Sequence, residues 1–325
     1  MTRFIAKLQR GIKMKIGFVF PGQGSQNIGM GKDIFDSYSE YRNLYNKAKD
    51  ILNIDIANLT FRSSEEELAQ TKNTQISILL MSLGILEILK NNNIHSEYLA
   101  GLSLGEYSAL IYSSSFNFEN GLNIVKKRGE LMQENVPSGN WSMSAILGLE
   151  DEKVDKLCKE VSKYGFVVPA NYNCPGQVVI SGEQKAVCLA MEKAKELGCK
   201  KAIELKTNGP FHTEKLQIAS KKFKKELEKI IIIPPNKKVI KNINAELYTK
   251  TDNMVSILSN HIISPVKFSN SIKELINLGV DTFAEIGPGK TLSGFIKKIN
   301  PSLKILNTYN KENLENTIKF INNTK

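Results

Sequence analysis

The chain has few of the residues that bind metals or form disulfides. Among its 325 residues are three histidines and four cysteines, the latter at positions 158, 174, 188 and 199. The cysteines show neither a CxxC pattern nor paired spacing, so we expect no disulfide framework, no zinc site and a reducing compartment. The three histidines are scattered along the chain, so we expect no metal cluster.

The chain also lacks an apolar run long enough to cross a membrane. The longest run, residues 76–89, is shorter than the roughly 20 residues that a span needs, and it contains Glu87. We therefore expect a buried helix and no membrane association. Residues 1–15 carry five basic side chains and no acidic one. We interpret residues 1–13 as a basic N-terminal extension, similar to the stub of a transit peptide, because no complete targeting signal is visible.

Negative charge is outweighed by positive charge. The chain has 33 acidic and 44 basic residues, a formal net charge of +11, with lysines concentrated at 200–201, 221–225 and 237–238. Two explanations fit these runs equally well. One is a solvated lysine-rich surface, and the other is attraction to acidic partners, which would raise the rate of encounter. Nucleic acid is not an expected partner, because no recognised binding module or basic strip with interleaved aromatic residues is present.

The motif with the most chemical content is Gly101-Leu-Ser-Leu-Gly105, which follows a short apolar segment and opens a predicted helix. Gly-x-Ser-x-Gly between a strand and a helix is the pattern of a nucleophile elbow. Glycine at both ends avoids collisions with the neighbouring strand and helix, so Ser103 can project its hydroxyl into a cleft at the positive end of the helix. Taken alone, the motif is equally consistent with an ordinary loop.

A second glycine-rich segment, residues 21–30, follows the apolar strand pattern of residues 16–20. Backbone N–H groups in such a turn can hold an anion or a developing oxyanion. A dinucleotide site is excluded because Asn27 occupies the position of the third glycine in G-x-G-x-x-G. The segment 285–291 is likewise no phosphate-binding loop, because Ala284 stands where that motif requires glycine.

A serine nucleophile needs a base, and histidine is the usual base near neutral pH. His95 lies in a polar stretch after the apolar helix, which favours a solvated turn, and His261 is expected near a helix end. His212 follows a Gly-Pro turn at the mouth of a loop. We therefore predict that His212 is the base.

Six segments of the chain form an ordered set of motifs. They are FPGQGSQNIGMG (20–31), GLSLGEYSAL (101–110), KKRGELMQENVP (126–137), NYNCPGQVVISG (171–182), GPFHT (209–213) and EIGPGKTLSG (285–294). In this order they resemble the malonyl-CoA:acyl carrier protein transacylase family, the acyltransferases that supply fatty-acid synthesis. They span nearly the whole chain, and six ordered motifs are far more specific than any one of them.

The resemblance implies a role for each of five residues. Ser103 would attack the malonyl thioester to give a malonyl-serine ester, and His212 would be the general base. Gln23 and Leu104 would supply the backbone N–H groups of the oxyanion hole. Arg128 would hold the free malonyl carboxylate, which a planar guanidinium can bind through two charge-assisted hydrogen bonds. Without the resemblance, Arg128 would be read as a solvated member of a basic run.

Three further positions bear on selectivity and on the base. The family orients its catalytic histidine with a backbone carbonyl, and the matching position is His261, where bacterial members carry glutamine. Leu102 stands where many members have histidine. Phe211, directly before the base, implies malonyl rather than methylmalonyl, because a bulky ring leaves little room for an α-methyl branch. Core packing is the alternative role for Phe211.

The function that the resemblance implies is ping-pong transfer of malonyl from CoA to the phosphopantetheine of an acidic acyl carrier protein, in type II fatty-acid synthesis. No cofactor is expected, since malonyl-CoA is a substrate. The alternative is a GxSxG thioesterase or esterase. We expect a monomer that is not secreted. Abundant lysine, asparagine and isoleucine indicate an AT-rich genome, so we expect a plastid matrix similar to that of an apicoplast, with the bacterial cytoplasm as the alternative.

The order of predicted elements indicates an α/β fold. Strand patterns at 15–20, 97–101, 239–243 and 282–286 alternate with helices and predict an α/β-hydrolase-like core with a parallel sheet. Residues 142–207 follow the order β-α-β-β-α-β, which predicts a ferredoxin-like subdomain. We expect a discontinuous catalytic core, 14–141 and 208–312, with this subdomain inserted and the site in the cleft between the two parts.

Overall fold

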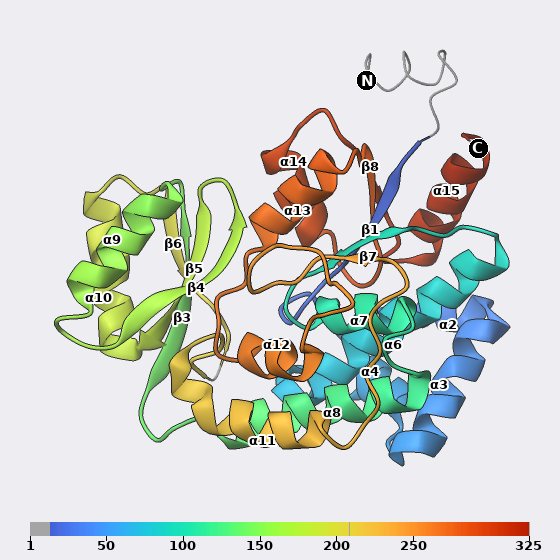
Figure 1. Cartoon of the computed structure of the whole chain (residues 1–325), viewed down its shortest axis with the longest axis horizontal. Helices are drawn as coiled ribbons and strands as arrows, with labels where there is room; N and C mark the ends of the chain where they lie inside the picture. Colours follow the sequence, from blue (N-terminus) through green and yellow to red (C-terminus); the bar gives the residue numbers. More distant parts are fainter. Residues whose placement is uncertain (1–13, 208, 325) are drawn as a thin grey trace.

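The computed structural model describes residues 14–207 and 209–324 and contains two separate sheets (Figure 1). The five strands of the first are all parallel and run in the order β7-β2-β1-β8-β9. They are β1 (Ile16–Phe20), β2 (Tyr98–Gly101), β7 (Lys238–Val239), β8 (Thr282–Glu285) and β9 (Lys304–Asn307). The predicted α/β class with a parallel sheet and a separate second sheet is confirmed, whereas the predicted extension 1–13 lies outside the described residues.

The central strand β1 is buried on both faces of the parallel sheet. Phe18 and Phe20 join one apolar cluster, while Val19 joins another. The first cluster includes side chains from α3 (Ser39–Leu52), α6 (Thr71–Asn91) and α8 (Phe118–Glu134), and the second includes side chains from α13 (Phe268–Asn277) and α14 (Thr291–Ile299). Since successive strand residues point to opposite faces, the alternation produces a sheet covered by helices on both sides.

Helix α6 is the buried helix that the longest apolar run predicts. It contains that run but is longer, with 21 residues. By length and composition alone it could cross a membrane, yet 83% of its most apolar 18-residue window is buried inside the protein. A helix that is apolar on all sides and surrounded by protein is a core helix.

The edges of the parallel sheet differ from the prediction. The segment 239–243 contributes only the short β7, because the chain turns back at Ile240, which pairs with Leu247. The sequence does not predict strand β9, since only Leu306 of its four residues is buried and the segment shows no alternating pattern. Helix α15 (Lys311–Asn322) continues past residue 312, the predicted end of the core, and belongs with the parallel sheet.

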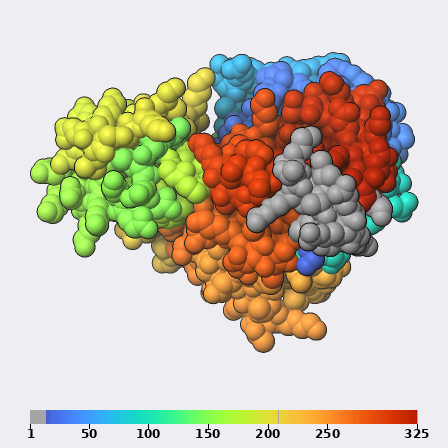
Figure 2. All heavy atoms as spheres, turned by 90° about the horizontal axis from the view of Figure 1, so that it is seen from above, coloured from blue at the N-terminus to red at the C-terminus, as the bar shows by residue number. Residues whose placement is uncertain are grey.

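Residues 141–204 contain the second sheet, which is antiparallel and has the strand order β4-β5-β3-β6. This is the strand order of a ferredoxin-like unit, and Figure 2 shows the segment as a lobe at one end of the molecule. The helices pack on one face through a cluster of their own, and the other face turns Met143, Ala145 and Val179 toward the rest of the chain. The elements are β3 (Trp141–Leu147), α9 (Asp151–Val161), β4 (Val167–Cys174), β5 (Gln177–Glu183), α10 (Gln184–Glu196) and β6 (Lys201–Glu204).

The loops that follow β1, β2 and β8 leave the sheet at the same edge, because the strands are parallel. Strand β2 ends in register with β1, Gly101 opposite Phe20, and the Leu102 N–H donates to the Phe20 carbonyl at 3.0 Å. A Cβ on Gly101 would collide with the backbone of Gly105, and a Cβ on Gly105 would collide with the Phe20 carbonyl. Both glycines of the serine motif are therefore required by close backbone contacts.

We predict that Gly105→Ala destabilises the protein by about 2–3 kcal/mol, because the added methyl must push β1 and α7 (Gly105–Tyr112) apart. The free energy of unfolding from urea titration measures this. The matched control is Gly294→Ala in α14, where nothing lies within 4 Å of the added Cβ. The control should stabilise by about 0.5–1 kcal/mol. Equal effects of the two substitutions would contradict the packing argument.

Candidate active site

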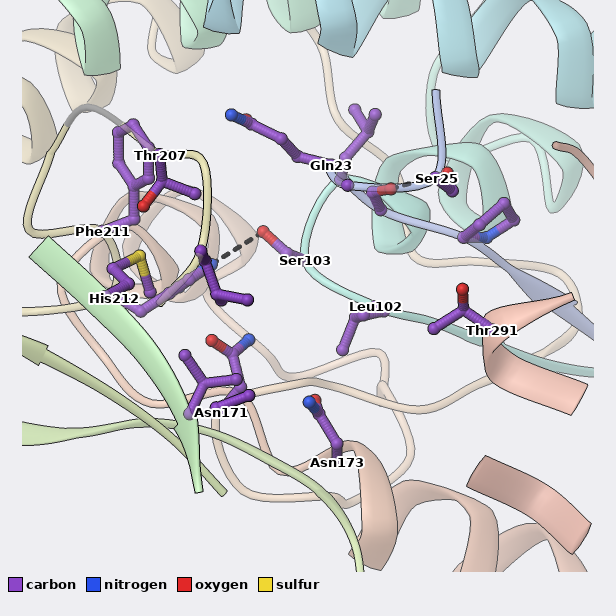
Figure 3. Close-up of a pocket in the computed structure, with 18 of the residues that line it drawn as sticks. Gln23, Ser25, Leu102, Ser103, Asn171, Asn173, Thr207, Phe211, His212 and Thr291 are labelled. Atoms are coloured by element: carbon purple, nitrogen blue, oxygen red, sulfur yellow. Dashed lines mark hydrogen bonds between the residues drawn. The ribbon is translucent and has the colours of Figure 1, made fainter. Parts of the chain in front are cut away.

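Ser103 lies at the tip of the turn between β2 and α7 with a backbone φ of 53°, in the left-handed region that residues with a side chain rarely adopt. The Asn242 side chain holds this backbone. Its Oδ1 accepts from the Ser103 N–H at 2.7 Å, and its Nδ2 donates to the Gly101 carbonyl at 2.8 Å. Strain that is maintained by a buried side chain is typical of functional sites. Here it turns the Ser103 hydroxyl toward a cavity (Figure 3).

His212 faces Ser103 from a loop far along the chain. Its Nε2 lies 2.7 Å from the Ser103 Oγ (Figure 3). Its Nδ1 lies 3.0 Å from the main-chain carbonyl of His261. This is the arrangement that the sequence predicts for a base and its orienting group. Like Ser103, His212 has a positive φ, of 59°, and the neighbouring Thr213 closes the turn by donating to the Pro210 carbonyl.

Burial keeps the His212 ring neutral. Loss of solvent, followed by the nearby positive charge of Arg128, lowers the pKa of His212 from 6.5 to about 4. The ring is therefore unprotonated at neutral pH. With its Nδ1 hydrogen donated to the carbonyl of His261, the unprotonated Nε2 can accept the proton of the Ser103 hydroxyl.

Arg128 is buried and not part of a solvated basic run. It lies on α8 with 1% of its surface exposed, and its guanidinium donates to the Gln75 Oε1 at 2.8 Å and to the Ser103 Oγ at 3.2 Å. Its guanidinium carbon also lies 5.1 Å from the centre of the Tyr107 ring. No carboxylate within residues 14–207 and 209–324 forms an ion pair with it. Burial lowers its pKa and the charge of the buried Glu106 opposes that shift, but a guanidinium keeps its charge in proteins. The described residues that line the cavity therefore supply a cation and no carboxylate.

Ser103, His212 and Arg128 share one cavity of about 240 Å³, which runs between the two sheets. The antiparallel sheet contributes an apolar wall and several amide side chains, and the start of α14 lies on the opposite side. Phe211 lines the same cavity and is 5% exposed. The other lining side chains include Leu102, Met132, Met143, Asn171, Asn173, Gln177, Val179, Thr207, Thr291 and Phe295.

Gln23 and Leu104, expected to supply the oxyanion hole, line this cavity together with Ser103. The loop that carries Gln23 lies directly against the serine turn, since a Cβ on Gly22 would collide with the Leu102 carbonyl. Leu104 precedes the first residue of α7, so its N–H belongs to the positive end of that helix.

The structure brings together residues that the sequence did not single out. Gln75 orients Arg128 from α6, and Asn242 supports the serine turn. The position of Asn242, near the end of the predicted strand 239–243, was a usable signal, because ligand sites form at the carboxyl ends of parallel strands. Gln75 showed a weaker signal, as a polar residue beside the apolar run 76–89.

His95 is exposed, as expected. In the part of the chain that the structure describes, no group of three or more His, Cys, Asp or Glu could hold a metal ion.

A serine on a strand-to-helix turn, within hydrogen-bond distance of a buried histidine and a buried arginine, is the arrangement of an acyl-transferring site. The chain matches the model of the acyl transferase domain over residues 17–322 and belongs to that family.

Within the family, the most similar relatives share one name. The chain is 43% identical over 308 residues to the malonyl CoA-acyl carrier protein transacylase of Bacillus subtilis, covering 94% of this chain and 97% of the relative. The corresponding protein of Clostridium perfringens superposes with a TM-score of 0.91 at 45% identity, covering 95% and 98% of the two chains. A malonyl-transacylase solved with a type II PKS acyl-carrier protein superposes with a TM-score of 0.91 at 34% identity, covering 94% and 99%. The chain is thus a member of the malonyl CoA-acyl carrier protein transacylases.

The pKa of His212 predicts how the reactivity of Ser103 depends on pH. His212 must be neutral to accept a proton, and it is neutral above its pKa of about 4. Labelling of Ser103 by a fluorophosphonate, followed by intact mass, should therefore persist as the pH falls through 6.5 and decline about tenfold per unit only below about 4. Circular dichroism at each pH checks that the protein stays folded. A decline centred near 6.5 in folded protein would mean that the base is not buried.

Proposed function

We propose that this protein transfers a malonyl group from CoA to the phosphopantetheine of an acyl carrier protein through an ester on Ser103. The observation that carries the proposal is the unpaired Arg128 guanidinium, 3.2 Å from the Ser103 hydroxyl. A malonyl thioester has its reactive carbonyl and its free carboxylate separated by one carbon. A cation beside the nucleophile can therefore hold the carboxylate while the carbonyl lies against Ser103.

The reaction divides into two similar halves. His212 takes the proton of Ser103 as its oxygen attacks the thioester carbonyl, and the oxyanion develops beside the N–H groups of Gln23 and Leu104. The C–S bond then breaks, and CoA leaves as a thiol after receiving the proton from His212. The thiol of phosphopantetheine attacks the ester with His212 again as base, which regenerates the serine and gives ping-pong transfer.

Two features support transfer over the alternative of a hydrolase. The Nδ1 of His212 faces a main-chain carbonyl, where a GxSxG hydrolase of the triad type uses a carboxylate. Apolar side chains from several elements also line the cavity, among them Met132, Met143 and Phe295, and they disfavour water beside the ester.

Phe211 supports a preference for unbranched malonyl. Its buried ring lines the cavity directly before the base, and an α-methyl branch would have to share that space. We propose that Phe211 excludes methylmalonyl by size, an effect that can exceed the roughly 1–3 kcal/mol of a single methylene in an apolar site. Faster acylation of Ser103 by methylmalonyl-CoA in Phe211→Ala than in the wild type would test this. No gain would leave core packing as its role.

The relatives support a proposal for the partner and the compartment of this protein. A similar malonyl-transacylase is solved in complex with an acyl-carrier protein, and the net charge of +11 suits an acidic partner. The relatives with a named source are bacterial, so they lend no support to a plastid, and we propose the bacterial cytoplasm. We also propose that residues 142–207 act as an inserted subdomain beside the core 14–141 and 208–312, to which the rest of α15 (Lys311–Asn322) also belongs. A monomeric state remains a prediction.

Ser103→Ala should abolish covalent loading. After mixing with malonyl-CoA, the wild type should gain the mass of one malonyl group on Ser103, and the variant should gain none, because the attacking oxygen is gone. Intact mass spectrometry with peptide mapping measures both. A persistent adduct on another residue would defeat the assignment, and rapid release of free malonate without carrier protein would favour the hydrolase.

Arg128→Ala should impair malonyl transfer by about 100-fold or more and acetyl transfer by about tenfold or less, since only malonyl presents a carboxylate to the guanidinium. The kcat/KM for the two acyl-CoA substrates measures this. Lys127→Ala is the matched control on the same helix, because Lys127 is half-exposed and pairs with Glu130 at 2.9 Å. The control should change neither value. Equal losses for both substrates would assign Arg128 a structural role.

A further inference from the structure

A buried carboxylate lies behind the active site, outside the cavity that Ser103 faces. Glu106 is in the first turn of α7, and none of its surface is exposed. Its Oε1 accepts from the Tyr248 hydroxyl, and its Oε2 accepts from the Asn242 N–H at 3.2 Å. Because the transfer chemistry uses other groups, this charge needs a separate explanation. Burying a carboxylate away from solvent costs free energy unless hydrogen bonds and opposite charges compensate for it.

One partner of Glu106 leads to the nucleophile. Asn242, whose N–H donates to Glu106, uses its own side chain to hold the Ser103 N–H at 2.7 Å and the Gly101 carbonyl at 2.8 Å. The position of Asn242 therefore determines where the strained serine backbone lies. Glu106 fixes that position from the opposite side.

Another partner leads to the base. The His261 Nδ1 lies 3.3 Å from the Glu106 Oε2, and both side chains are fully buried. The main-chain carbonyl of the same His261 orients the His212 Nδ1 at 3.0 Å. The rings of the two histidines are 5.3 Å apart. A shift of the His261 ring would move the carbonyl to which His212 donates.

Two groups donate hydrogen bonds to Glu106, the Tyr248 hydroxyl and the Asn242 N–H. The His261 ring lies beside the carboxylate without a hydrogen bond to it. A carboxylate accepts from both donors, one on each oxygen, whereas the amide of a glutamine presents its NH2 group to one of them. Burial raises the pKa of Glu106 to about 7, so the carboxylate form prevails at pH 8. The positive charges of Arg128 and Lys241 oppose that rise.

We infer that Glu106 is a positioning residue that ties the support of the nucleophile, Asn242, to the support of the base, His261. It touches no substrate atom and acts through the spacing of Ser103 and His212. The inference rests on the proposed function, because it is measured as the rate at which malonyl-CoA acylates Ser103.

Glu106→Gln, which keeps size and shape, tests the inference in single-turnover acylation at pH 8. We expect the acylation rate constant to fall about 100-fold, because a small displacement of reacting groups is enough for such a loss. The malonyl-CoA concentration at half-maximal rate should change less than about twofold, because Glu106 does not line the cavity.

Tyr248→Phe is the gentler second variant, since it removes a single hydroxyl that donates to Glu106. We expect a smaller loss of rate, about tenfold. The loss in the double variant should match that of Glu106→Gln alone, because both changes act through one carboxylate.

Leu314→Ala in α15 is the control for stability, because it leaves a cavity in the core away from this network. It should lower Tm while the acylation rate constant stays unchanged at a temperature where the protein is folded.

Three results would overturn the inference. These are an unchanged rate constant in folded Glu106→Gln and Tyr248→Phe, a loss that appears only in the half-saturating concentration, and losses that simply add in the double variant. If the wild type itself formed no malonyl-serine, the proposed function would fail instead. The two failures are thus distinguishable.

Discussion

The approach of the serine turn to the end of β1 is the constraint on which the rest of the site depends. Gly101 and Gly105 permit backbone contacts that no other residue allows, and Asn242 holds Ser103 in a left-handed conformation between them. The hydroxyl consequently lies beyond the edge of the sheet, at the start of α7. Without this turn, neither the base nor the arginine would have a nucleophile to act on.

Loss of solvent gives the surrounding groups their chemistry. It lowers the pKa of His212 and keeps the ring able to accept a proton, and it raises the pKa of Glu106 behind the site. It also leaves the Arg128 charge without a carboxylate partner in the described part of the chain, which makes the cavity attractive to an anionic acyl group. Burial destabilises these charges in the free protein. A substrate with a carboxylate offsets that destabilisation by pairing with Arg128.

The family resemblance and the local motifs allowed much of the site to be predicted. The spacing of glycine and serine at 101–105 requires a tight turn, and only three histidines were available as the base, of which His212 had a suitable setting. The order of strand and helix patterns along the chain likewise indicated both sheets. The prediction was weakest where the signal was short, as for β7, β9 and the end of α15.

By itself, the sequence determined the chemistry that is available, because the residue types and the local turn requirements are written in short segments. Only the tertiary structure decided which groups meet. Ser103 and His212 are 109 residues apart, and Arg128 looks like part of an exposed basic run until α8 is packed against the core. Gln75, Asn242 and Glu106 acquire their roles only through contacts between distant elements. Such contacts depend on the packing of whole helices and sheets, which no local pattern specifies.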